Sequence, residues 1–173
     1  GIIAWEGYLF SKPDSSYYFA QLQYDFAKKT DNLFFVASAL NTQGATYWIQ
    51  NNYANAIDHF LKCLQIHEEQ GDEGSMAAIL NNVGLIYQQQ GNLIESKKYY
   101  QKSLEKFENL GFIHSATGPL NNLGNIYKTL GDYSMAMEYF SRAMKIGEEY
   151  DIKESISESL NNLGEIYREM GEY

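Results

Sequence analysis

A segment of eight residues returns at intervals of 40 along this chain, and it constrains the fold more than any other feature. It reads Leu-Asn-Asn-Leu-Gly-x-Ile-Tyr, with Val for the second Leu in one copy, and it occupies residues 80–87, 120–127 and 160–167. A weaker copy begins at Leu40. Self-similarity at a fixed period of tens of residues indicates an array of small structural units rather than one globular core.

Each unit reads as two helices joined by a short turn. In the first helix, Leu80, Val83 and Tyr87 are spaced i, i+3 and i+7, which places them on one face. In the second, Tyr100 and Leu104 follow the same rule. The chain has only two prolines among its 173 residues, so little interrupts these helices. The pattern predicts an all-α protein built from helix pairs.

The turn between the helices also repeats. Gly91 and Gly131 fall where a helix ends in a left-handed residue. The next residues are Asn92, Asp132 and, in the last unit, Glu172; Asn and Asp are good N-caps for the helix that follows. Because the turn is short, we expect the two helices of a unit to be antiparallel neighbours.

A glycine recurs inside the first helix of each unit, at Gly84, Gly124 and Gly164. Glycine in a helix interior costs about 1 kcal/mol relative to alanine, so its recurrence needs a reason. We expect close approach of the paired helix, with the glycine facing small residues such as Ala136.

These features predict about nine helices in antiparallel pairs, forming one array over residues 1–173. First helices are expected near residues 33–50, 74–90, 115–130 and 154–170. Second helices are expected near residues 15–30, 53–70, 93–110 and 133–150. Pro119 is expected in the first turn of its helix, or at a kink. The array divides into a degenerate repeat 1–32, full repeats 33–72, 73–112 and 113–152, and a partial repeat 153–173.

The order Leu-x2-Leu-Gly-x2-Tyr, followed by Ala-x3-Phe at Ala136 and Phe140, resembles the tetratricopeptide repeat. The resemblance is clear over residues 33–173 and weak over 1–32. Three departures stand out: Leu replaces the pattern's Trp, Glu replaces its closing Pro, and the period is 40 rather than about 34. Such long repeats are similar to arrays in animal cell-polarity adaptors, kinesin light chains, and bacterial sensor kinases and response-regulator phosphatases. The resemblance implies a superhelical solenoid that binds proteins or peptides.

Composition narrows the range of partners. Thirteen Lys and Arg against twenty-two Asp and Glu give a net charge of −9, which disfavours nucleic acids and anionic membranes. No apolar run approaches the roughly 18 residues that span a bilayer. The N-terminal segment does not read as a signal peptide, because it has no basic start and Glu6 interrupts it. The single cysteine, Cys63, fits a reducing compartment, so we expect a cytoplasmic protein.

The residues that usually carry chemistry are sparse. The three histidines, His59, His67 and His114, lack Cys or carboxylate partners at metal-ligand spacing. Cys63 shares a column of small residues with Ser103 and Ala143, which favours a core position over a nucleophile. No phosphate-binding glycine loop occurs. We therefore expect no enzyme activity, no metal and no cofactor.

Paired asparagines at the start of each repeated segment are the best binding candidates, because Asn is a poor helix former that a core does not need. The second of each pair follows the core Leu by two residues, about 200° around the helix, and so points away from the core. In the family that the chain resembles, this column lines the concave groove and hydrogen-bonds the partner's backbone. The alternative is that the asparagines cap helices or bridge neighbouring repeats. The groove interpretation selects Asn82, Asn122 and Asn162, with free amides.

Further groove candidates lie one helical turn along. They are Thr42, Gln89, Asn125, Glu165 and Arg168. The Lys and Arg that clamp a C-terminal carboxylate in chaperone-binding members of the family are missing, since those columns hold Ser38, Ala78, Gly118 and Glu158. The mixture favours a polar, extended peptide as the ligand.

Two functions remain open. The first is a scaffold that binds a protein or an extended peptide. The second is a regulatory or sensor module of a larger signalling protein, acting through self-association or domain contact. The helix of the partial repeat carries Leu160, Leu163, Ile166 and Tyr167 with no second helix of its own, so we also expect contact between copies through it.

Overall fold

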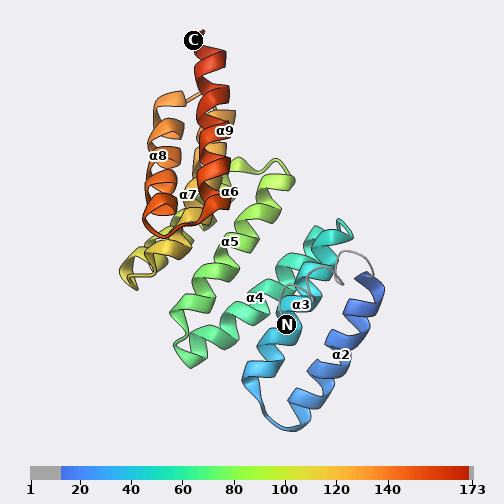
Figure 1. Cartoon of the computed structure of the whole chain (residues 1–173). Coiled ribbons are helices and arrows are strands. Elements are labelled where there is room, and N and C mark those ends of the chain that lie inside the picture. Colours follow the sequence, from blue (N-terminus) through green and yellow to red (C-terminus); the bar gives the residue numbers. More distant parts are fainter. Residues whose placement is uncertain (1–12, 172–173) are drawn as a thin grey trace. The chain divides into compact units, whose positions relative to one another are not determined.

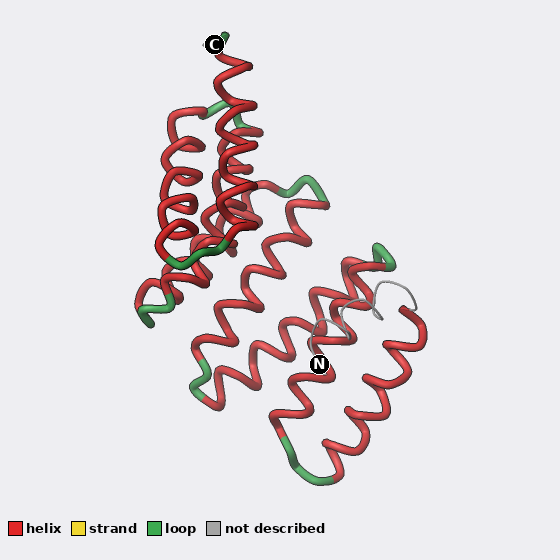
Figure 2. Tube along the Cα trace, viewed as in Figure 1, coloured by secondary structure: helices red, strands yellow, loops and turns green. Residues whose placement is uncertain are grey.

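The computed structural model describes residues 13–171, and over this range it contains helices and turns but no strand (Figures 1 and 2). The all-α prediction is therefore confirmed. The described part holds eight α-helices and one 3-10 helix. In chain order they are α2 (Pro13–Lys29), α3 (Leu33–Ile49), α4 (Tyr53–Gln70), α5 (Glu73–Gln89), α6 (Leu93–Asn109), η1 (Ile113–Ala116), α7 (Thr117–Thr129), α8 (Tyr133–Glu149) and α9 (Lys153–Met170).

The predicted helix boundaries lie close to those of the structure at every end. The most informative difference is at α7, which starts at Thr117 after the 3-10 turn η1. Pro119 is buried in the first turn of α7, as expected. A proline nitrogen cannot donate to the carbonyl of a preceding α-helical turn, so the chain enters this helix through 3-10 geometry.

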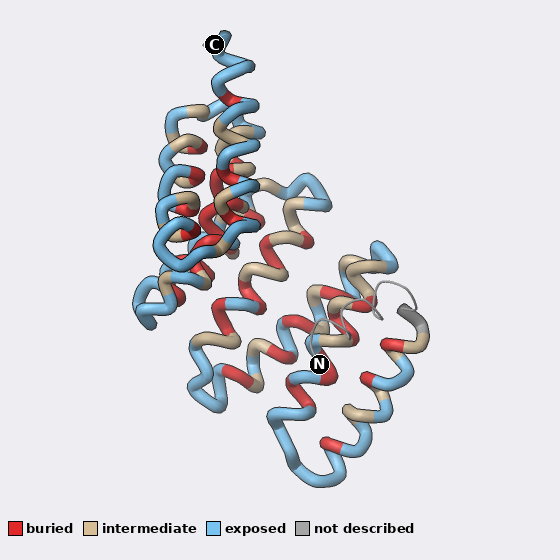
Figure 3. Tube along the Cα trace, in the orientation of Figure 1, coloured by how far each residue is buried: buried red, intermediate tan, exposed pale blue. Residues whose placement is uncertain are grey.

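The helices gather into two compact units, residues 1–86 and 87–173. In the first unit, α3 packs against both α2 and α4. In the second, α7 packs against α6 and α8, and α8 packs against α9. Buried residues line the facing sides of these helices in each unit (Figure 3). Assignment of the whole chain to a single array stays a prediction.

The backbone repeats at half the period of the sequence. A residue with positive φ stands in every turn between consecutive α-helices, and these residues are evenly spaced along the chain. The set consists of Asp31, Asn51, Gly71, Gly91, Gly111, Gly131 and Asp151, and Gly171 continues the spacing after α9. The predicted left-handed positions Gly91 and Gly131 are confirmed. Asp and Asn are the residues other than glycine that best tolerate this conformation.

In several of these turns, the residue that follows the one with positive φ caps the next helix. Asn92 Oδ1 accepts from the Glu95 backbone N–H at 3.2 Å, and Asp132 Oδ1 accepts from that of Met135 at 3.1 Å. Both predicted caps are confirmed. The predicted cap Glu172 lies outside the described residues.

Two glycines inside first helices, Gly44 and Gly124, face aromatic rings, not small residues, which corrects the sequence-based expectation. A Cβ built on Gly124 would lie 2.6 Å from Cε1 of Phe140, and one on Gly44 would lie 3.1 Å from the ring of Phe60. Phe60 and Phe140 are buried. The close approach is real, but the neighbour is the large residue of the Ala-x3-Phe pair.

We predict opposite effects of alanine at two equivalent glycines, because Gly164 has nothing within 4 Å of its built Cβ. Gly124→Ala overpacks the ring, at a cost of about 1–3 kcal/mol, against a gain of about 1 kcal/mol in helix propensity. It should lower the free energy of unfolding. Gly164→Ala should raise it by up to about 1 kcal/mol. Urea unfolding of both variants measures this, and equal changes would contradict the ring contact.

Candidate functional site

The first unit contains a groove between α3 and α5, and its floor is made by α4. The larger of two cavities in this α3–α5 groove has a volume of about 240 Å³. Its lining consists of Phe34, Ala37, Ser38, Asn41, Cys63, His67, Ser75, Ala78, Ile79 and Asn82. None of these residues is Lys, Arg, Asp or Glu. The cavity therefore has apolar walls with a few polar side chains among them.

The cysteine on the floor of this cavity is unreactive. Cys63 is fully buried, and its Sγ lies 3.2 Å from the carbonyl oxygen of Ala37, to which it donates. Burial raises the pKa of the Cys63 thiol to about 12. A thiol that stays protonated is a poor nucleophile. The predicted core role of Cys63 is confirmed.

His67, also on the floor, is held beside the cap of α5. Its Nδ1 is 3.2 Å from Asp72 Oδ2, although no aligned hydrogen bond joins the two atoms. Asp72 Oδ1 accepts from the backbone N–H of Ser75 at 3.0 Å, and this bond holds the pKa of Asp72 below its usual value. The carboxylate is thus fixed as a helix cap, outside the cavity lining.

Asn82 lies between two cavities of the α3–α5 groove. It lines the larger one and also a smaller one of about 70 Å³, which is bordered by Ala45, Trp48, Phe60 and Leu85. Its side-chain amide makes no hydrogen bond within residues 13–171. On the facing helix, the exposed side chain of Asn41 is likewise unbonded in the described part of the chain.

In the second unit, the residue equivalent to Asn41 is used to join two repeats. Asn121 is 2% exposed; its Nδ2 donates to Glu158 Oε2 at 3.0 Å, and its Oδ1 accepts from Ser159 Oγ at 2.9 Å. Asn121 belongs to α7, and its two partners belong to α9. For this residue the bridging alternative is the correct interpretation.

A second bridge between the same helices involves Lys128. Its Nζ donates to Asn162 Oδ1 and to Glu165 Oε2, the latter at 2.8 Å, and the contact with the Lys128 ammonium keeps the pKa of Glu165 below its usual value. Asn162 Nδ2 donates to the Glu158 carbonyl oxygen at 3.0 Å. The expected free amide of Asn162 is therefore wrong, because a neighbouring lysine occupies it. Together, Asn121, Lys128, Glu158, Ser159, Asn162 and Glu165 form the α7–α9 seam.

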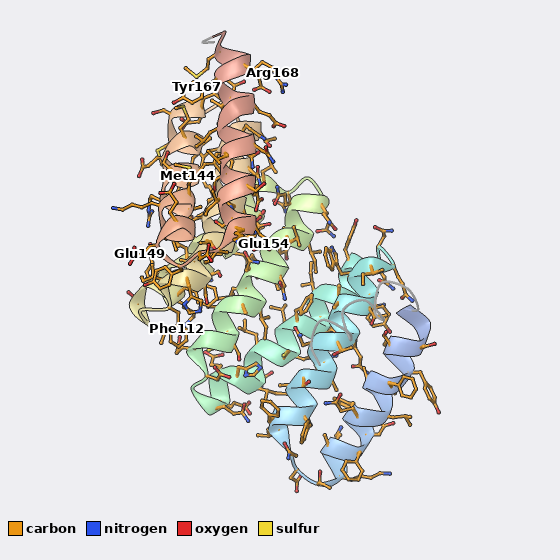
Figure 4. All side chains as sticks on the ribbon, in the orientation of Figure 1. Phe112, Met144, Glu149, Glu154, Tyr167 and Arg168 are labelled. Carbon is orange, nitrogen blue, oxygen red and sulfur yellow. The ribbon has the colours of Figure 1, made fainter. Side chains whose placement is uncertain are left out.

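The remaining predicted residues are scattered over the two units. Thr42, half-buried on α3, donates its hydroxyl to the Ser38 carbonyl oxygen at 3.1 Å. Asn122 and Asn125 are half-buried on α7, and Asn122 takes part in a further interaction, as does Gln89 at the end of α5. Arg168 is exposed on α9 (Figure 4). Whether any of them contacts a ligand stays a prediction.

Sequence reasoning missed Lys128 and the apolar lining of the α3–α5 groove. The sequence did contain a signal for the bridge. The two residues of the next repeat that bond to Asn121 are both polar, Glu158 and Ser159. The corresponding positions beyond Asn41 hold Ala78 and Ile79, whose side chains cannot bond to an amide.

Residues 13–171 contain no group of three or more His, Cys, Asp or Glu side chains arranged to hold a metal ion. No helix in the same range is long and apolar enough to cross a membrane.

Comparison with known proteins gives one family and several similar structures. The tetratricopeptide repeat family matches residues 35–109, 75–149 and 115–173. No curated protein sequence matches this chain.

Three solved structures show the same fold at low sequence identity. BtubC (BKLC) from P. vanneervenii is 20% identical, with a TM-score of 0.70 over 99% of this chain and 80% of its own. A Rap protein complexed with competence and sporulation factor is 19% identical, with a TM-score of 0.81 over 95% of this chain and 49% of its own. Aspartyl phosphate phosphatase F from Bacillus subtilis is 20% identical, with a TM-score of 0.73 over 88% and 43%. This chain thus spans about half the length of the last two.

We predict that alanine has different effects at two asparagines that occupy the same position in different repeats. Asn121→Ala removes a buried amide with two partners and should lower the free energy of unfolding by about 1–3 kcal/mol. Asn41→Ala, at the equivalent exposed position, should change it by less than about 0.5 kcal/mol. Thermal and urea unfolding of both variants give the comparison, and an equal loss at Asn41 would show that its amide is structural.

We also predict that Cys63 resists modification in the folded protein. At pH 8 a thiol with a pKa of about 12 is almost wholly protonated, and Cys63 is shielded from solvent. Reaction with a disulfide reagent should therefore follow unfolding of the first unit, so urea should accelerate it by orders of magnitude. A rate in native buffer equal to that of the denatured chain would contradict this arrangement.

Proposed function

Because this chain belongs to the tetratricopeptide repeat family, we propose that it is a non-catalytic scaffold that binds a protein or an extended peptide on the surface of its first helices. The α3–α5 groove carries this proposal. It combines a cavity of about 240 Å³ with amides that make no hydrogen bond within the described chain. An unbonded amide donates and accepts, so it can pair with a peptide backbone whatever the side chains are.

A solved structure with the same fold supports the same function. The Rap protein that resembles this chain was crystallised with competence and sporulation factor. A fold hosts many functions, so the likeness adds weight only together with the groove in this chain.

The proposal includes a cytoplasmic location and a non-catalytic role. A cytoplasmic protein fits a single unpaired and buried cysteine, since thiols stay reduced there. A scaffold needs no activated nucleophile, and burial holds the Cys63 thiol in its protonated form. The net charge of −9 argues for partners that are neutral or basic.

The predicted groove asparagines give the test. Peptides selected from a random library on the full chain should bind at least tenfold more weakly to a variant with Asn82→Ala, Asn122→Ala and Asn162→Ala. Its melting temperature should fall modestly, because Asn162 bonds to Lys128. Asn161→Ala, an exposed neighbour on α9, is the control and should leave affinity unchanged. A large loss of stability with unchanged affinity would assign these residues a structural role instead.

A second candidate function, self-association within a larger signalling protein, is favoured by α9. Leu160, Tyr167 and Met170 are 54%, 43% and 45% exposed and lie near one face of the helix, at i, i+7 and i+10. Tyr167 and Arg168 project to different sides near its end (Figure 4). Ile166 is fully buried and packs with Phe140, so only part of the apolar face of α9 is exposed.

Sedimentation velocity at increasing concentration tests this candidate. If copies associate through α9, the sedimentation coefficient should rise with concentration, and Leu160→Glu should abolish the rise by placing a charge in the contact. Leu110→Glu, a change at an exposed leucine in another part of the second unit, is the control. A monomer at all concentrations would exclude association through this face.

A further inference from the structure

We propose that the peptide site is confined to the α3–α5 groove and that it takes an extended segment with two apolar side chains at alternate positions, followed by a basic residue. This inference rests on the proposed function and narrows it to one of the two units. It also names the class of ligand. It follows from the differences between two equivalent helix pairs within the chain.

The two helix pairs differ in chemistry at equivalent positions, two repeat periods apart. In the α7–α9 seam, Asn121 is bonded to Glu158 and Ser159, and Asn162 to Lys128. The equivalent residues between α3 and α5 are Asn41, Ala78, Ile79, Asn82 and Trp48. The asparagines are therefore kept, while Ala78 and Ile79 stand in place of Glu158 and Ser159, and Trp48 stands in place of Lys128. A buried amide costs free energy without a partner, but these two amides border an open groove where a ligand can reach them.

The cavities on either side of Asn82 fix the form of the ligand. In an extended chain, side chains at i and i+2 lie on the same side, about 6.6 Å apart. One such side chain enters the larger cavity, between Ala37 and Ala78. The other enters the smaller cavity, beside Trp48 and Leu85. Asn82 lies between the cavities, where the backbone of the intervening residue would pass.

The lining excludes charged side chains from the larger cavity. The lining holds no Lys, Arg, Asp or Glu, and its one histidine, His67, already lies 3.2 Å from Asp72 Oδ2, so a charged ligand side chain would be buried without a partner of its own, which is costly. Apolar side chains of the peptide bring no such cost. Contact with Cys63, Ile79 and the alanines of the lining removes apolar surface of the peptide from water. The smaller cavity, about 70 Å³, limits the second side chain to a small aliphatic one.

The turn beside the larger cavity is acidic and therefore complements a basic residue of the peptide. The segment from the end of α4 to the start of α5 carries four exposed acidic residues, and Ser75 in the first turn of α5 lines the cavity. These acidic residues are Glu68, Glu69, Asp72 and Glu73. A peptide whose larger apolar side chain fills the cavity places its next residues toward this turn. A Lys or Arg at that point would be attracted, and an acidic residue repelled.

The experiment begins with selection of a displayed random dodecapeptide library on the full chain. The best peptide, labelled with fluorescein, then becomes the probe for anisotropy titrations of four variants. Ala78→Glu changes an exposed residue of α5. It introduces a carboxylate at the position equivalent to Glu158, which accepts from Asn121 in the second unit. Asn82→Ala removes the amide between the cavities. Glu158→Ala and Lys128→Ala, at residues of the α7–α9 seam, are the controls in the second unit.

We expect the selected peptides to share two apolar residues separated by one position, with Lys or Arg beyond them. Ala78→Glu and Asn82→Ala should each weaken the probe at least tenfold, while the two controls change its affinity by less than threefold. Circular dichroism melts show which variants fold. If Ala78→Glu does not fold, the affinity of Asn82→Ala is the deciding measurement.

Two results would overturn the inference in different ways. Peptides that depend on Glu158 or Lys128 rather than Asn82, or that lack the alternating apolar pair, would move the site out of the α3–α5 groove and leave the scaffold function standing. A library from which nothing is enriched would overturn the scaffold function as well.

Discussion

Contact between a glycine and an aromatic ring holds the paired helices close together, and the other features depend on it. Phe60 fills the space that a side chain at Gly44 would take, and Phe140 does the same at Gly124. The glycine lowers helix propensity by about 1 kcal/mol, and the buried ring more than offsets this loss by the apolar area it removes from water. Because the ring enters the first helix so closely, that helix cannot rotate without exposing it. The opposite face of the first helix, which carries the second asparagine of each pair, is thereby fixed.

Most of the fold could be predicted from the sequence because it depends on local chemistry. Left-handed glycines such as Gly131 and caps such as Asp132 act within a few residues of themselves, so their spacing alone places the helix ends. The core columns follow from helical periodicity, and Phe140 and Cys63 are buried as their positions require. At Pro119 the local rule gave the correct position within its helix but did not predict the 3-10 turn before it.

The candidate site could be predicted only in part, because it depends on pairs of residues from different repeats. Asn82 and Asn162 occupy equivalent positions in equivalent segments, so a pattern confined to one repeat treats them alike. Their surroundings differ because Lys128 reaches Asn162, whereas the residue at the same place near Asn82 is Trp48. The same backbone thus supports a polar bridge in one unit and an open groove in the other. Such a difference appears in the sequence only when residues of neighbouring repeats are compared as pairs.

The left-handed turns recur twice in each period of the side-chain pattern. Backbone geometry alone therefore does not distinguish a first helix from a second helix, and only the glycine and aromatic columns assign each helix its role. A chain that lost one helix together with one turn would keep the caps and lengths of all the others. It would nevertheless bring two helices of the same kind together, ring against ring or glycine against glycine. Loss of a complete helix pair would preserve the alternation, so length can vary in this architecture only by whole helix pairs.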